Sequence, residues 1–220
     1  MKTVFKTIRS SLFENHPIRS LFVLCICMLL LGACSILPIP LSTPTVTSSP
    51  SPTPDAEMLA ERVYTALVDT LYPTSALLVI MEQTQTSVIG LAEVATYQRV
   101  QESLKEMSAE TLQNFRLENN ELHTLRTSMV LGRKYILFSL KDRQELFRIN
   151  QSGWDVFYNR YPDAPGIITF SKVGFNKTMD QALVYVGMQS NWLAGVGNFY
   201  LLQQVNGKWV IEAQVNSWIS

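Results

Sequence analysis

Residues 196–218 read VGNFYLLQQVNGKWVIEAQVNSW, and this stretch decides the fold class. Asn206-Gly207 separates two runs that are rich in β-branched, aromatic and other apolar residues. A two-residue hairpin loop requires positive φ at both positions, which Asn and Gly adopt at the least cost. With that loop Val205 opposes Lys208, and we expect the pairing to continue one residue for one residue along both strands.

This register assigns the hairpin side chains to two faces, because successive residues of a strand point to opposite sides of the sheet. The first face is expected to be the core, and it holds Tyr200, Leu202, Trp209, Ile211, Ala213 and Val215. The second face is more mixed, which predicts a partly covered surface or the wall of a cavity, and it holds Phe199, Leu201, Gln203, Val210, Glu212 and Gln214.

Four strands are predicted after Gly166, separated by short turns that favour an antiparallel meander. They are residues 167–173, 182–189, 196–205 and 209–218. One of the turns contains Asn176-Lys-Thr178, which matches a glycosylation acceptor but is more simply a hairpin turn. Gly195-Val-Gly197 lacks the following helix of a dinucleotide loop, and it predicts a bulge or a close backbone approach.

The region before Gly166 is predicted to be richer in helices. Asp55 can cap a helix with apolar residues every fourth position until Pro73, and Ser108 can cap another. Capping boxes are predicted at Ser139 to Asp142, opening a helix through Ile149, and at Ser152 to Asp155. Two short apolar runs, 76–81 and 134–139, predict strands. The last helix should place four aromatic rings on one core-facing side, namely Trp154, Phe157, Tyr158 and Tyr161.

These patterns predict an α+β fold in which a helix-rich N-terminal half packs on a C-terminal four-stranded antiparallel meander. We expect one such domain over residues 55–220, because a chain of 220 residues fits one or one and a half domains. Its architecture is reminiscent of cystatin-like or nuclear-transport-factor-2-like cones. That likeness concerns architecture alone and implies no function.

The N-terminal region is predicted to be a targeting segment. Residues 1–20 are polar and basic, and residues 21–31 form an apolar run (LFVLCICMLLL) that is too short for a membrane span of about 20 residues. The sequence Leu31-Gly-Ala-Cys34 that follows resembles the bacterial lipobox. This resemblance implies a lipoprotein signal peptide over residues 1–33 and diacylglycerol attached through a thioether to Cys34. The alternative is an uncleaved anchor over residues 18–33.

Residues 34–54 are predicted to form a stalk. The last twenty of them contain six Pro and nine Ser or Thr but no charged residue, so they cannot bury enough apolar surface to fold. At about 3.1 Å per residue in polyproline geometry, twenty residues reach at most about 60 Å. A proline-rich ligand for a partner domain is the alternative interpretation of this stretch.

Composition excludes several kinds of site from the exported part of the chain. Cys25 and Cys27 leave with the signal peptide and Cys34 takes the lipid, so no thiol remains for a disulfide, a metal or a nucleophile. Of the two His residues only His123 remains, in a polar stretch that predicts a solvated loop. Lys plus Arg equal Asp plus Glu at 18 each, so no strongly basic surface is available for nucleic acid.

No motif predicts catalysis or a cofactor. Glu82, Asp155 and Glu212 are scattered carboxylates without a spacing that pairs them. Glu118 to Glu121 offers two acids and no Gly for the sharp turn of a calcium loop. We therefore expect no catalytic, cofactor or metal-binding residue, and lipid attachment at Cys34 is the one predicted site.

A resemblance is visible over about residues 71–220 and is strongest after Trp154. Its marks are FSKVGFN, ALVYVG, LAGVG, NGKWVI and the terminal WIS. They resemble a class of uncharacterised bacterial secreted or lipoprotein domains of unknown function, which brings no activity with it. Some such domains carry a Cys pair in the segment that here is residues 189–195, and this chain has none.

Two functions are therefore expected from the sequence. The first is a lipoprotein of the cell envelope, held by its lipid on the extracytoplasmic face of a bacterial membrane, whose domain binds an envelope protein, a wall component or a small ligand. The second is a cone-fold enzyme of the isomerase or hydratase kind with a small apolar pocket. A closed cavity lined by His123 or by a buried carboxylate would favour the enzyme.

Lipid attachment is tested directly by the mass of the mature chain. We expect the purified wild-type protein to begin at a diacylglycerol-modified Cys34, and Cys34→Ala to leave an uncleaved precursor without lipid. Mass spectrometry that finds an intact N-terminus and an unmodified Cys34 in the wild-type protein would contradict the prediction.

Overall fold

The computed structural model describes residues 54–85, 92–148 and 152–220. All of them belong to the unit formed by residues 48–220. The predicted signal peptide, Cys34 and the stalk up to residue 53 lie outside the described residues. No helix within the described ranges has the length and apolar character that a membrane crossing requires.

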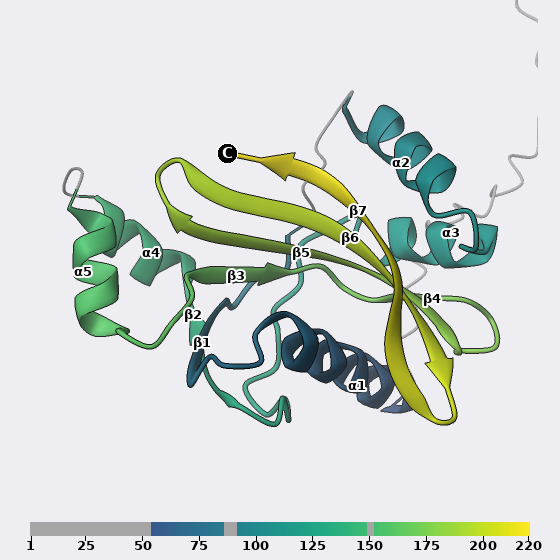
Figure 1. The fold of residues 1–220 in the computed structure, drawn as a ribbon, viewed down its shortest axis with the longest axis horizontal. Helices are drawn as coiled ribbons and strands as arrows, with labels where there is room; N and C mark the ends of the chain where they lie inside the picture. Colours follow the sequence, from purple (N-terminus) through teal and green to yellow (C-terminus); the bar gives the residue numbers. More distant parts are fainter. Residues whose placement is uncertain (1–53, 86–91, 149–151) are drawn as a thin grey trace, which may run out of the picture. The chain divides into compact units, whose positions relative to one another are not determined.

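Five helices and seven strands make up the described part of the chain (Figure 1). The α+β class predicted from the sequence is confirmed. In chain order the elements are α1 (Pro54–Leu71), β1 (Leu77–Met81), α2 (Ala92–Ser103), α3 (Ala109–Glu118), β2 (Lys134–Phe138), α4 (Leu140–Phe147), α5 (Gly153–Arg160), β3 (Ile167–Phe170), β4 (Gly174–Phe175), β5 (Gln181–Asn191), β6 (Ala194–Val205) and β7 (Lys208–Ile219).

The seven strands form one mixed sheet, in the order β2-β1-β3-β5-β6-β7, with β4 pairing β5. The four predicted strands are present and pair antiparallel as β3, β5, β6 and β7. The prediction of a helix-rich half on a four-stranded meander is nevertheless wrong in detail. Strands β1 and β2, which come from the N-terminal half, extend the same sheet in parallel pairing beside β3.

The β6–β7 hairpin begins in the predicted register and then departs from it. Asn206 and Gly207 have φ values of 51° and 77°, and pairing runs as expected from Val205 with Lys208 to Leu202 with Ile211. The next pair is Leu201 with Ala213, so a β-bulge leaves Glu212 as an extra residue. A second register shift follows at Gly197.

The bulge changes which residues share a face, because one extra residue reverses the alternation beyond it. Ala213 and Val215 therefore pack with Phe199 and Leu201, and their predicted place on the Trp209 face is wrong. The second face is partly covered, as the sequence predicts: Phe199 and Leu201 have no exposed surface, whereas Val210 is 44% exposed.

One face of the sheet packs on α1, which lies across it (Figure 1). The buried positions of α1 recur along one side of the helix, as the sequence predicts for an amphipathic helix. Tyr64 stacks at a tilt on Phe170, with 5.0 Å between ring centroids. This core also includes Val63, Leu67, Val68, Leu78, Ile80, Ile168, Val184, Leu202 and Trp209.

The opposite face packs on α2 and α3. Phe115 of α3 sits at the centre of this core, 5.7 Å from the ring of Phe199 and 6.2 Å from that of Tyr97. The remaining buried members are Val100, Leu104, Leu112, Leu183, Tyr185 and Leu201. Strands β5 and β6 are thus buried on both faces, which explains their nearly continuous apolar runs.

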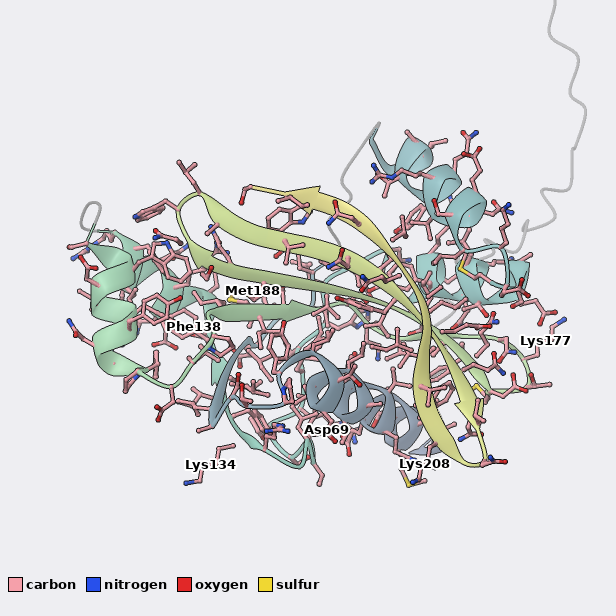
Figure 2. All side chains as sticks on the ribbon, viewed as in Figure 1. Asp69, Lys134, Phe138, Lys177, Met188 and Lys208 are labelled. Carbon is pink, nitrogen blue, oxygen red and sulfur yellow. The ribbon has the colours of Figure 1, made fainter. Side chains whose placement is uncertain are left out.

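A third core joins α4 and α5 to the parallel end of the sheet. Trp154 and Phe157 are buried and pack with Tyr158 and Tyr161, as the helical spacing predicts. Phe138 at the end of β2 belongs to the same cluster, whereas Lys134 at the other end of that strand extends into solvent (Figure 2).

The two predicted capping boxes have different outcomes. Ser139 accepts from the amide of Asp142 at 3.1 Å and the Asp142 carboxylate accepts from the Ser139 amide, so the first box is confirmed. The second box is wrong: the Ser152 side chain makes no cap hydrogen bond, and its ψ of 2° departs from the extended backbone that an N-cap requires.

Trp209 provides a test of the core on the α1 face. Its ring is buried against Phe175, with 5.9 Å between centroids, and its Nε1–H has no hydrogen-bond partner among the described residues. Trp209→Ala therefore removes packing without breaking a hydrogen bond, and we expect it to lower the free energy of unfolding by about 3–5 kcal/mol.

The matched control is Val210→Ala, on the next residue, whose side chain is exposed and which we expect to change stability by less than about 1 kcal/mol. Urea denaturation of both variants measures the difference. Equal losses would show that Trp209 does not occupy the core.

Candidate functional site

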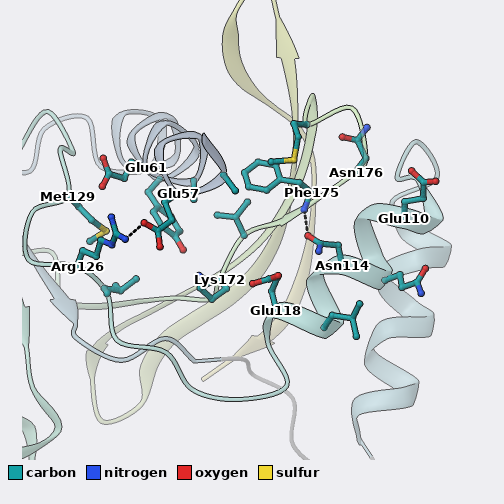
Figure 3. A pocket seen from close by; sticks show the side chains of 18 of the residues that line it. Glu57, Glu61, Glu110, Asn114, Glu118, Arg126, Met129, Lys172, Phe175 and Asn176 are labelled. Atoms are coloured by element: carbon teal, nitrogen blue, oxygen red, sulfur yellow. Dashed lines mark hydrogen bonds and ion pairs between the residues drawn. The ribbon is translucent and has the colours of Figure 1, made fainter. Parts of the chain in front are cut away.

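A groove of about 630 Å³ lies between α1 and α3 (Figure 3). The loop of residues 124–129 closes one side, and the segment of residues 172–179 forms its base. These parts of the wall come from distant points of the sequence. The groove therefore depends on how the helices are fixed to the sheet.

Gly174 fixes the distance between α3 and β4. A Cβ atom added there would overlap the backbone of Phe115, so only a residue without a side chain permits this approach. Next to it, the amide of Phe175 donates to Oδ1 of Asn114 at 2.7 Å. Helix α3 and strand β4 are therefore joined by backbone contact and by a hydrogen bond.

Asn119, which follows α3, completes the connection. Its Oδ1 accepts from the amide of Lys172 at 2.8 Å, and its Nδ2 donates to the carbonyl of the same residue at 3.1 Å. This pair of bonds is what a neighbouring strand would provide, because it satisfies both polar groups of one backbone residue. Asn114 and Asn119 thus take the place of a strand along residues 172–175.

The buried amide of Gln181 fixes the other end of α3. Its Oε1 accepts from the amide of Ser108 at 2.7 Å and from the hydroxyl of Thr111 at 2.9 Å. Its Nε2 donates to the carbonyl of Glu106 at 2.9 Å. Ser108 also caps α3 through the amide of Thr111, as the sequence predicts.

The opposite wall is α1, and Tyr64 holds it against the base of the groove. The phenol of Tyr64 donates to the carbonyl of Ser171 at 2.8 Å, and burial raises the pKa of this phenol. Ala56 and Ala60 lie on the groove side of the same helix. Their small side chains leave the space that the groove occupies.

The floor of the groove is apolar and its rim is charged (Figure 3). Buried side chains form the floor, chiefly Leu125, Met129, Val173 and Phe175. Leu117 of α3 also lines the groove and is 61% exposed. A solvent-open apolar surface of this kind is a common feature of sites that bind apolar ligands or protein segments.

Two ion pairs lie on the rim. Arg126 pairs with Glu57 of α1, and Lys177 pairs with Glu110 of α3 at 2.6 Å. The hydrogen bond from Lys177 lowers the pKa of the Glu110 carboxyl. Three further charges, on Glu61, Glu118 and Lys172, form no ion pair with any described residue.

The predicted turn at Asn176 is confirmed at the end of the groove. Asn176 Oδ1 accepts from the amides of Asp180 and Gln181, each at 3.1 Å, and so closes the β4–β5 connection. Hydrogen bonds from the side chains of Asn176 and Thr178 lower the pKa of the Asp180 carboxyl. This turn positions Met179, whose φ is 57°, beside the groove.

The carboxylates considered in the sequence are not brought together. Glu82 follows β1, Asp155 lies on α5 and Glu212 lies at the bulge of β7, and none of the three lines the groove. His123 lies in a loop, as predicted, but it is half-buried, with Nε2 2.9 Å from the carbonyl of Glu118. Within the described ranges, no three His, Cys, Asp or Glu side chains are grouped closely enough to hold a metal ion.

Gly195 and Gly197 are covered by the indole ring of Trp218, which agrees with the predicted close approach. A Cβ at either Gly would overlap this ring. The Trp218 Nε1–H donates to the phenol oxygen of Tyr185 at 2.7 Å. The Gly-Val-Gly segment therefore serves packing on the sheet, at a distance in sequence from every residue that lines the groove.

Comparison with known proteins assigns this chain to no family. No protein-family model, no curated protein and no solved structure matches this chain. The groove is therefore characterised by its own geometry alone.

Sequence reasoning assigned no role to Asn114, Asn119 and Gln181, which hold the walls of the groove in place. Asn114 lies on α3 and Asn119 directly follows it, and their partners lie more than fifty residues later. The available signal was polar residues beside a predicted amphipathic face, together with Gly174 inside a run of apolar residues. Neither signal identifies a partner without the tertiary structure.

Asn119 provides a test of this arrangement. Asn119→Ala leaves the amide of Lys172 without its partner, whereas the Lys172 carbonyl keeps the hydrogen bond from the Ser171 hydroxyl, and we expect a loss of about 1–3 kcal/mol in the free energy of unfolding. The neighbouring Asn120 is exposed, so Asn120→Ala is the matched control and should change stability by less than about 0.5 kcal/mol. Equal urea midpoints for the two variants would exclude the role given to Asn119.

Proposed function

We propose that this chain is a lipid-anchored lipoprotein on the extracytoplasmic face of a bacterial membrane, and that its domain binds an apolar segment of another envelope protein in the α1–α3 groove. The anchor rests on the lipobox resemblance at Cys34. The binding role rests on one observation, which is an open groove with an apolar floor and a charged rim.

The support behind the groove favours a binding role. Tyr64, Asn119 and Gln181 each use a side chain to hold a wall in place through a hydrogen bond of 3.1 Å or less. A wall that is fixed before the ligand arrives costs less ordering on binding. The groove is therefore suited to bind a segment without rearranging the fold.

The charges of the rim indicate the chemistry of the ligand. Four carboxylates and three basic groups line the groove: Glu57, Glu61, Glu110, Glu118, Arg126, Lys172 and Lys177. The excess of one negative charge opposes nucleic acid, whose binding requires neutralisation of phosphates by Lys and Arg. Glu61, Glu118 and Lys172 remain available to pair with charges that flank an apolar segment.

A cone-fold enzyme is the alternative, and the packing of the sheet argues against it. A cone of that kind would keep its reacting space on one face of the curved sheet, but here the α1 face is filled by Tyr64, Phe170 and Trp209. Among the described residues, the buried polar side chains are Thr84, Thr111, Ser171 and Gln181, and none carries a charge. A buried acid or base is what the enzyme would need.

The groove is tested by photo-crosslinking in the native membrane. With p-benzoylphenylalanine in place of Leu117, at the groove edge, we expect a covalent adduct with one envelope protein. Leu122 is the matched control, because it is 64% exposed but does not line the groove, and it should give no such adduct.

A substitution that fills the groove tests whether the crosslinked adduct forms there. Adding Ala56→Trp to the Leu117 probe should abolish the adduct, because the indole fills space between the two helices. Met58→Trp, two residues along and exposed, should leave it intact. The same adduct from both probe positions, or an adduct unaffected by Ala56→Trp, would contradict binding in the groove.

A further inference from the structure

The tip of the β5–β6 hairpin is an apolar pair of residues. Strand β5 ends at Asn191 and β6 begins at Ala194, so Trp192 and Leu193 form the turn (Figure 1). The Trp192 side chain is 45% exposed, and Leu193 is 85% exposed. Two adjacent large apolar residues therefore face water at the outermost point of a hairpin.

The turn itself does not require these residues. Tight hairpin turns favour Asn, Gly and Asp, and the other long hairpin of this sheet has Asn206-Gly207 at its tip. At the β5–β6 turn, a side-chain hydrogen bond is made by Asn191, whose Oδ1 accepts from the amide of Trp192 at 2.7 Å. Exposure of these apolar side chains to water is unfavourable, and the backbone geometry of the turn does not require it.

Aromatic packing holds the tip in place. The Trp192 ring packs edge-on against Phe147 of α4, with 5.4 Å between centroids, and Phe147 packs in turn on Trp154 at 5.0 Å. The phenol of Tyr158 donates to the carbonyl of Ser190 at 2.9 Å, just before the turn. The tip is therefore fixed to the third core and not a free loop.

Two Arg residues belong to the segment that packs against this tip. The guanidinium of Arg143 donates to Oε1 of Gln189 at 3.3 Å, three residues before Trp192, and exposed Arg148 follows Phe147 directly. Neither Arg forms an ion pair with a described carboxylate. Trp at the apolar–polar boundary with Arg beside it is the arrangement typical of segments that enter the interface of a bilayer.

The predicted stalk is long enough to allow this contact. Arg62, midway along α1, donates to the carbonyl of Gly207 in the β6–β7 turn, which is the opposite end of β6 from the tip. Strand β6 has 12 residues and so spans about 40 Å at 3.3 Å per residue. A stalk of up to about 60 Å exceeds that span. An anchored domain can therefore lay its hairpin tip on the membrane.

We propose that Trp192 and Leu193 insert into the interface of the lipid bilayer and give the anchored domain a second, reversible membrane contact. This proposal rests on the lipid anchor proposed above. Because the anchor confines the domain near the bilayer, even a weak contact is occupied through the high effective concentration. The contact would orient the domain and thereby direct its groove.

Trp fluorescence tests the insertion, because Trp192 is distinctive among the four Trp of the chain. In the folded domain, Trp154 and Trp209 are buried and Trp218 is half-buried. The mature lipidated chain is reconstituted in phosphatidylcholine vesicles with or without bromine on the acyl chains. We expect bromine to quench the wild-type emission, and Trp192→Phe, which keeps an aromatic ring against Phe147, to lose that quenching.

Two further variants separate a tip effect from general exposure. Leu193→Ser should weaken the quenching, whereas Val130→Ser, at an apolar residue that is 73% exposed and distant in sequence from the hairpin, should not. The proposal would be overturned if the vesicle-bound chain had equal Trp emission in brominated and unbrominated vesicles. It would also be overturned if the bromine quenching persisted in Trp192→Phe. A chain whose Cys34 carries no lipid by mass, and which stays free of vesicles, would instead overturn the proposed anchor and this contact with it.

Discussion

The backbone contact between Gly174 and Phe115 is the constraint on which the second face of the sheet and the groove both depend. It seats α3 so closely that the Phe115 ring reaches Phe199 on β6 and closes the core on that side. The same seating leaves the outer side of α3 facing α1 across the segment of residues 172–179. One residue without a side chain thus links the stability of the domain to the shape of its candidate site.

Strands β5 and β6 explain why helices are needed on both sides. Residues 182–186 are buried without interruption, so neither face of these strands could be left in water. Helix α1 covers one face, and α2 with α3 covers the other. Because of the bulge at Glu212, strand β7 contributes to both cores. Trp209 and Ile211 pack on the α1 side, whereas Ala213 and Val215 pack on the α3 side.

Much of the secondary structure could be predicted from the sequence because its signals are local. Asn206-Gly207 identified the hairpin turn, Ser108 and Ser139 identified helix starts, and the aromatic spacing on α5 identified a core face. The parallel pairing of β1 and β2 could not be predicted in this way, since their residues are more than fifty positions apart. The bulge was also hidden, because Glu212 fits the alternation of a regular strand.

The groove was beyond sequence reasoning for a related reason. Its walls come from distant parts of the sequence, and the side chains of Asn119 and Asn114, which bind Lys172 and Phe175, precede those residues by more than fifty positions. The second capping box failed because Ser152 lies outside the extended backbone region that the motif needs. The predicted lipid site at Cys34 lies outside the described residues, so its prediction still rests on the lipobox resemblance.

Hydrogen exchange of two backbone amides tests the central claim most directly. The amides of Lys172 and Phe175 bind side chains of Asn119 and Asn114, so their protection depends on α3 remaining seated on β4. If that seating is part of the folded core, both amides should exchange as slowly as those of Leu183 and Val184 in β5. Exchange as fast as that of Lys177 and Thr178 in the neighbouring turn would show that α3 detaches freely, which would contradict a groove built before its ligand binds.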